Sequence, residues 1–129
     1  MKARIYFLSA FAVGVLALQA AHGQEIQRTD LVKEDISVAG NEAVQVRVDF
    51  NPGASAVNHK HPGEEIAYVI EGTLEYQLEG REPITLKAGE SLFIRSGVAH
   101  SAKNVGEGKA SELATYIVAK GQPIFVPVK

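Results

Sequence analysis

Residues 53–72 read GASAVNHKHPGEEIAYVIEG, and this stretch holds two of the chain's four histidines. His59 and His61 are two positions apart, so both rings project to the same side if the segment is extended. The pair Pro62-Gly63 favours a turn, which would fold Glu65 back toward the same point. Imidazole and carboxylate groups together suit zinc, copper, iron, nickel and manganese, so the stretch predicts a metal site.

The alternative interpretation is that residues 59–61 form a solvated polar loop, which an isolated His-x-His often does. The sequence on either side is therefore needed to choose between a metal site and a solvated loop. Val44–Phe50 alternates strictly between apolar and polar residues, the period of a strand with one buried face. Turn-forming residues follow at Asn51-Pro52-Gly53.

Short strands and turns account for the rest of the chain after residue 23. We expect strands over residues 44–50, 66–70, 73–78, 84–86, 92–94 and 113–118. Short strands with turn signals at intervals of about 8–12 residues are typical of a β-sandwich or a small barrel. No stretch has a helical period, so we predict one all-β domain over residues 24–129.

Two ordered motifs resemble those of the cupin superfamily. The first is a glycine, five residues, His-x-His, three or four residues, Glu, six residues and a glycine. It matches at every defined position, which are Gly53, His59, His61, Glu65 and Gly72.

The second cupin motif follows the first along the chain. It is a glycine, five residues, Pro-x-Gly, two residues, His, three residues and Asn. The chain matches it at Gly89, Gly97, His100 and Asn104 and departs from it at Arg95, where proline is usual. The loss of proline removes a fixed φ before the turn but no metal ligand.

The resemblance implies an antiparallel jelly-roll barrel of six to eight strands. It also implies that His59, His61, Glu65 and His100 converge on one metal ion inside the barrel. Arg95 is a further candidate, since it would pair with an anionic ligand if it reached the mouth of the pocket. An exposed arginine at a strand end is, however, ordinary.

Four protein ligands leave one or two metal positions for water, substrate or O₂, whereas structural sites are more often closed and rich in thiolates. We therefore expect a metal-dependent enzyme of dioxygenase-like type acting on a small organic molecule. The alternatives are a non-enzymatic protein that binds metal or a small ligand, and a cupin isomerase or decarboxylase. Fold alone does not choose among them.

The first 23 residues have the layout of a secretory signal peptide. Lys2 and Arg4 precede an apolar run from Ile5 to Leu18, and small residues lead to Ala21-His22-Gly23. A membrane anchor is the alternative, but the run is shorter than the ~20 apolar residues that span a bilayer. We expect a periplasmic or secreted protein.

Export bears on which metal the site would hold. A chain that folds outside the cytoplasm acquires its metal there, and affinity at nitrogen and oxygen ligands rises from manganese and iron toward copper, with zinc below copper. This order places copper or zinc ahead of iron or manganese. Nickel comes last.

The amino-acid composition limits the kinds of partner that we expect. Removing the first 23 residues leaves 11 basic and 15 acidic residues, a net charge of −4 without any basic run, which argues against nucleic acid or an anionic membrane as a partner. Cysteine is absent, so the domain depends on its core, a metal or an oligomer interface for stability. Because residues 66–70 are apolar on both faces, we expect a homodimer.

Overall fold

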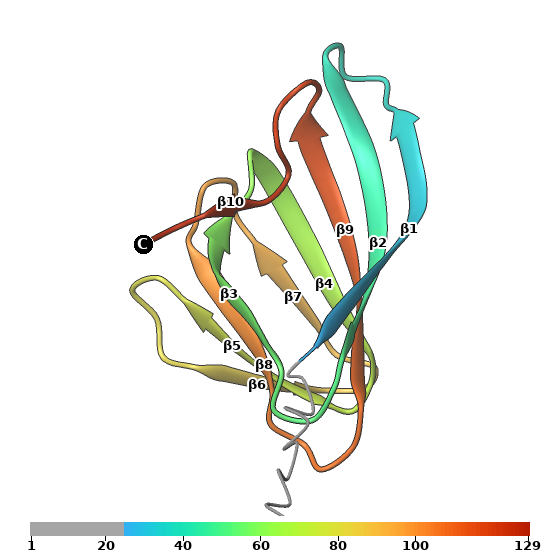
Figure 1. Cartoon of the computed structure of the whole chain (residues 1–129). Helices are drawn as coiled ribbons and strands as arrows, with labels where there is room; N and C mark the ends of the chain where they lie inside the picture. The colour runs from blue at the N-terminus through green and yellow to red at the C-terminus, as the bar shows by residue number, and fades with distance from the viewer. Residues whose placement is uncertain (1–24) are drawn as a thin grey trace, which may run out of the picture.

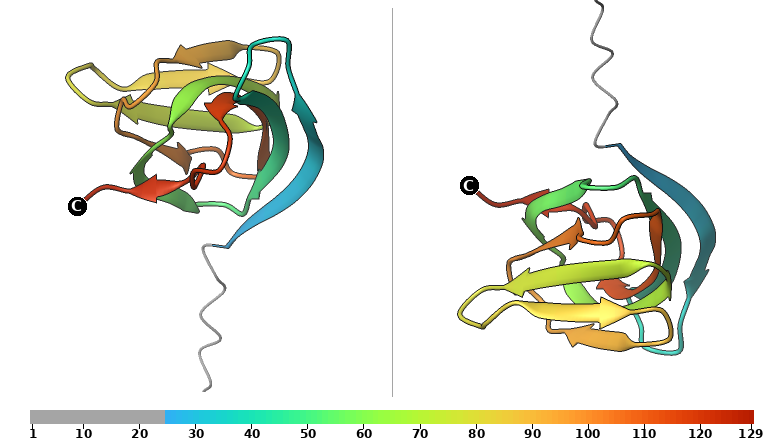
Figure 2. Two further views of the ribbon diagram at one scale, coloured as in Figure 1. Left: turned by 90° about the horizontal axis from the view of Figure 1, so that it is seen from above. Right: turned by 90° about the horizontal axis from the view of Figure 1, so that it is seen from below.

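The computed structural model describes residues 25–129, and the predicted signal peptide at residues 1–23 lies outside them. The described part contains ten strands and no helix. They form two five-stranded antiparallel sheets that face each other as a flattened barrel (Figures 1 and 2). The first sheet has the order β1 (Ile26–Asp35), β2 (Asn41–Phe50), β9 (Ala110–Ala119), β4 (Gly63–Glu71) and β7 (Ser91–Ile94). The second has the order β10 (Val126–Pro127), β3 (Ser55–Lys60), β8 (His100–Asn104), β5 (Thr73–Leu78) and β6 (Ile84–Lys87).

This arrangement confirms the predicted all-β jelly-roll. The ten strands exceed the six to eight expected, because β1 and β10 each add a strand to one edge of a sheet. Every predicted strand overlaps an observed one. In the described part of the chain no helix is long and apolar enough to cross a membrane.

The core lies between the sheets and follows the alternation seen in the sequence. Val44, Val46, Val48 and Phe50 of β2 are buried, while the residues between them are half-buried. Each fully buried side chain of this kind contributes about 1.5–3 kcal/mol relative to exposure. The period-two pattern therefore corresponds to the face that closes the barrel.

Strand β4 shows the same parity and places Glu65 inside. Glu65, Ala67 and Val69 are buried, whereas Ile66 and Tyr68 are exposed on the outer face, at 44% and 42%. The exposed Phe93 of β7 lies opposite Ile66. The outer apolar face that the sequence predicts is thus present and uncovered in the single chain.

Two glycines hold β4 close to its neighbours. A Cβ atom on Gly63 would overlap the backbone carbonyl oxygen of Ile117 in β9. Gly72 has a φ of +76°, and a Cβ there would lie 2.5 Å from the carbonyl oxygen of Lys109. Only glycine permits both the close approach and the left-handed turn, so these residues fix where β4 presents Glu65.

Candidate metal centre

The four predicted ligands come from both sheets. His59 lies on β3 and His100 begins β8, and the two residues are directly opposite each other in that pairing. Glu65 lies on β4 of the other sheet, and His61 lies in the connection between β3 and β4. The turn expected at Pro62-Gly63 is therefore also the point where the chain crosses from one sheet to the other.

The structure brings all four side chains together. One nitrogen or oxygen atom from each of His59, His61, Glu65 and His100 lies within 4.8 Å of the others. The four residues are between 2% and 5% exposed. The Nε2 atoms of His61 and His100 lie 2.9 and 3.1 Å from the same oxygen, Glu65 Oε2.

Backbone carbonyls orient each imidazole. His59 Nδ1 lies 2.6 Å from the Val57 carbonyl oxygen, and His100 Nδ1 lies 2.9 Å from that of Val98. His61 Nδ1 lies 2.6 Å from the carbonyl oxygen of Ile124, in the segment that leads to β10. A carbonyl can only accept, so each Nδ1 carries the proton and donates it. Each Nε2 is therefore left as a lone-pair donor directed into the cluster.

This donor set fits a transition metal. His61 Nε2 is buried without a directed hydrogen bond, despite its short distance to Glu65. Unprotonated Nε2 atoms and a carboxylate oxygen repel one another unless a proton or a cation lies among them. Three imidazoles and one carboxylate are ligands that bind zinc, copper, iron, nickel or manganese.

The protonation of the cluster agrees with this interpretation. Burial opposes ionisation of Glu65, but the hydrogen bond with His100 and the adjacent His61 imidazole outweigh it and lower its pKa to about 2. Burial lowers the pKa of His59 to about 4, so its imidazole is neutral. Burial would also lower the pKa of His100, but the hydrogen bond to Glu65 outweighs it and raises that pKa. Without metal, the raised pKa of His100 favours a proton between its Nε2 and Glu65.

Aromatic side chains support the histidines from outside the cluster. The Phe125 ring stacks on His59 at a centroid distance of 4.3 Å and an angle of 22°. The Tyr116 ring of β9 lies 4.6 Å from the ring of His61. The segment 124–125 therefore both orients His61 through its backbone and packs on His59 through its side chain.

A second buried polar pair escaped the sequence analysis. The Tyr76 hydroxyl donates a hydrogen bond to Glu112 Oε2 inside the barrel. Burial, followed by the nearby charge of Glu65, raises the pKa of Glu112 to about 7. Glu112 has the same strand parity as Ala114 and Tyr116, which are buried on β9. That parity is the signal by which the sequence places it inside.

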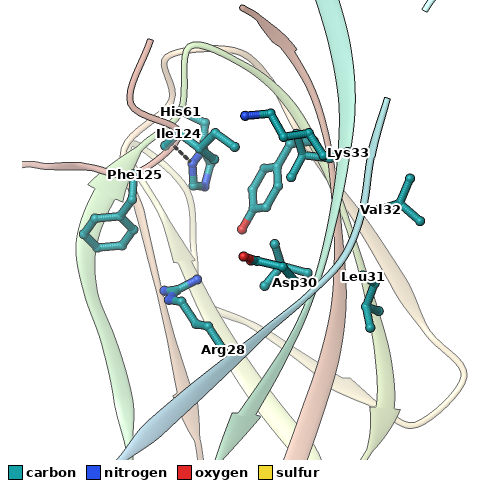
Figure 3. Close-up of a pocket in the computed structure, with 11 residues that line it drawn as sticks. Arg28, Asp30, Leu31, Val32, Lys33, His61, Ile124 and Phe125 are labelled. Carbon is teal, nitrogen blue, oxygen red and sulfur yellow. Dashed lines mark hydrogen bonds between the residues drawn. The ribbon is translucent and has the colours of Figure 1, made fainter. Parts of the chain in front are cut away.

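A pocket opens beside the cluster. It has a volume of about 490 Å³ and His61 forms part of its wall. Figure 3 shows Phe125 and Asp30 of β1 on opposite sides of this space, with Arg28 near Phe125. The metal centre is thus buried but has a neighbouring cavity that a small molecule could fill.

Arg95, the other residue singled out from the sequence, lies elsewhere. It is exposed and lines a separate hollow together with Leu78, Glu79, Arg81, Phe93 and Val98. None of the four clustered residues lines that hollow.

Comparison with known proteins identifies the family. The cupin domain model matches residues 46–118, so the chain belongs to the cupin family. The chain is 37% identical over 73 residues to an oxalate-binding protein of Thermotoga maritima, covering 56% of this chain and 60% of that protein. It is 32% identical over 90 residues to oxalate oxidase 2 of Hordeum vulgare, covering 64% of this chain and 40% of that one.

Solved structures show the same fold. An oxalate oxidase structure matches with a TM-score of 0.66 and 26% identity, over 84% of this chain and 57% of that one. A double-stranded β-helix protein of Klebsiella pneumoniae matches with a TM-score of 0.66 and 22% identity, over 81% and 86% of the two chains. The chain spans less than two thirds of the oxalate-binding protein and of the barley enzyme that it matches.

Proposed function

We propose that this cupin is an exported metal-dependent oxidoreductase of dioxygenase-like type that acts on a small organic acid. The observation that carries the proposal is the position of His61, which belongs to the buried three-histidine, one-carboxylate cluster and also to the wall of the 490 Å³ pocket. A molecule in this pocket lies next to the metal centre. The similarity to oxalate oxidases supports both the redox chemistry and the acidic ligand.

The chain's own residues have two roles, which are to hold the metal and to admit the substrate. His59, His61, Glu65 and His100 hold the metal, and the carbonyls of Val57, Val98 and Ile124 keep each Nε2 directed at it. A redox-active metal held by these residues would supply O₂ binding and the transfer of electrons from the substrate to O₂. The four ligands are between 2% and 5% exposed and His61 lines the pocket, so we expect ligands to reach the cluster through it.

We propose copper as the metal of such an activity, ahead of iron or manganese, with nickel last. Zinc ranks beside copper by affinity but has no redox chemistry. The ranking rests on the affinity order at nitrogen and oxygen ligands and on folding outside the cytoplasm. Elemental analysis of protein purified from its native compartment tests it, and stoichiometric manganese or iron without copper or zinc would overturn the ranking.

The test of the activity is O₂ consumption by metal-loaded protein with small organic acids, enediols and phenolics. We expect uptake that depends on substrate and is abolished by His61→Ala. Lys60→Ala is the matched control, because Lys60 lies between the two histidines and is exposed. Absence of O₂ uptake with a fully loaded protein would refute the oxidoreductase proposal.

A second candidate is a metal-dependent binding protein without catalysis. It is favoured by the similarity to the Thermotoga maritima protein, which is described as oxalate-binding. Saturable ligand binding without turnover of the ligand, measured by calorimetry and product analysis on the same loaded sample, would support it over the enzyme.

We further propose a homodimer formed through the outer face of β4 and β7. Ile66, Tyr68 and Phe93 are 44%, 42% and 52% exposed and lie together on that face. Sedimentation at micromolar concentration should give a dimer for the wild type and a monomer for Phe93→Glu. Val105→Glu, which changes an equally exposed residue elsewhere, should leave the dimer intact, and a monomeric wild type would contradict the proposal.

A further inference from the structure

Strand β1 carries charged residues on the face that points into the barrel. Its pairing with β2 places Arg28 opposite Val48 and Asp30 opposite Val46. Both valines are buried, and residues opposite each other in a sheet share a face. Arg28 and Asp30 therefore point inward from the edge of the sheet, as Figure 3 shows.

A bulge extends this charged face. The register shifts between Asp30 and Val32, so that Lys33 lies opposite the buried Val44. Without the shift, strict alternation would turn Val32 inward and Lys33 outward. The strand thus presents Arg28, Asp30 and Lys33 to the pocket, and all three line it.

Among these residues, Arg28 is the cation available to a ligand. Lys33 forms an ion pair with Glu42 at 3.8 Å. Within residues 25–129 Arg28 forms no ion pair, and its guanidinium carbon lies 5.3 Å from the centroid of the Phe125 ring. That ring stacks on His59. The Arg28 guanidinium also approaches the Tyr116 hydroxyl. A guanidinium has five N–H groups, so one oriented by these two contacts keeps others that can pair with a carboxylate.

The remaining wall of the pocket is apolar and aromatic. It includes Val44, Val46, Ile124, Phe125 and Tyr116. A volume of about 490 Å³ falls in the range of roughly 300–1,000 Å³ that holds drug-sized ligands. Oxalate has two carboxylates and no apolar part, so it would leave this wall without a partner.

We propose that the pocket binds an aromatic monocarboxylate, whose carboxylate pairs with Arg28 and whose ring lies against Val44, Val46 and Ile124. Asp30 adds selectivity, because it lies two positions from Arg28 on the same face and repels a second carboxylate. This inference rests on the proposed function for the position of the reacting centre, but it names a substrate class that oxalate does not represent.

The test is isothermal titration of the full chain after signal removal, with and without bound Zn²⁺. The probes are cinnamate, its neutral analogue cinnamamide, and oxalate. We expect cinnamate to bind at least about tenfold more tightly than cinnamamide or oxalate, since a charge-assisted pair contributes a factor of this order. Arg28→Gln should weaken cinnamate about tenfold and leave cinnamamide unchanged, whereas Arg28→Lys should recover part of the loss.

Arg81→Gln is the control, since Arg81 is an exposed arginine of the separate hollow. Cinnamate affinity that is unchanged by Arg28→Gln, or oxalate binding as tight as that of cinnamate, would overturn the inference. Metal content is measured on the same samples. If metal-loaded protein does not bind cinnamate, the proposed substrate class is refuted but the proposed metal site is not. Arg28-dependent cinnamate binding by protein that takes up no Zn²⁺ when metal is supplied supports the pocket and refutes the metal-dependent function.

Discussion

The metal centre and the β1 edge of the pocket differ in burial and in what positions their functional side chains. At the centre, His59, His61 and His100 are almost fully buried and each Nδ1 is held by a backbone carbonyl. At the edge, Arg28 is exposed and is positioned by the pairing of β1 with β2 and by an aromatic ring. Backbone contacts therefore orient the functional groups of the centre, whereas side chains orient the functional group of the edge, which lines the pocket that we propose for the ligand.

The largest effect should come from emptying the centre. Binding to the folded state alone stabilises by about 4 kcal/mol at a free metal concentration of 1,000 Kd. For a domain of this size, we expect a chelator to lower Tm by about 15 °C or more. His61→Ala should remove most of that difference, and Lys60→Ala should not. Equal melting of metal-free and loaded wild-type protein would contradict the metal site.

Acid should empty the centre without any mutation. The ligands bind metal only when deprotonated, and the raised pKa of His100 makes it take up a proton before His59, whose pKa is about 4. Metal occupancy should therefore fall as pH drops through about 6, as measured by elemental analysis after gel filtration. Full occupancy at pH 5 would contradict this sequence of events.

Glu112 should give a smaller effect of opposite pH dependence. Its pKa is about 7 in the folded protein and near 4.5 when exposed, so the folded state binds its proton more tightly. Below about pH 4.5 Glu112 is protonated in both the folded and the unfolded state. As pH rises from there through 7, the unfolded state loses the proton first, so the free energy of unfolding falls. Glu112→Gln should raise the free energy of unfolding at pH 8 by about 1–3 kcal/mol and flatten its dependence between pH 5 and 8. Denaturant titrations should show neither change for the exposed control Glu79→Gln.

The smallest effects on stability should come from the edge. Arg28→Gln and Arg95→Gln change exposed side chains, for which shifts within about 0.5 kcal/mol are usual. The two arginines should differ only in ligand affinity, with Arg95→Gln close to wild type in the cinnamate titration. A larger loss for Arg95→Gln than for Arg28→Gln would transfer the ligand site to the other hollow.

The strands that the sequence analysis missed were missed for identifiable physical reasons. Strand β1 is exposed along nearly its whole length, so its sequence has no period-two alternation to reveal it. Strands β3 and β8 are short and hold the metal ligands, so polar residues replace the apolar ones that mark a strand. Glu112 lies one residue before the predicted strand 113–118, and extending that strand by one residue would have allowed the parity argument that placed Glu65.

By itself, the sequence determined the family, the all-β fold and the group of four clustered residues. Motif spacing and the alternation of apolar and polar residues involve residues close together in the chain, so both can be read without the structure. The tertiary structure alone decided which carbonyl holds each imidazole, that Tyr76 meets Glu112, and that Arg28 rather than Arg95 faces the cavity beside His61. Each of these depends on strand pairing between residues far apart in the chain. The β1 bulge shows the reason most directly, since a shift of one residue decides which side chains face the pocket.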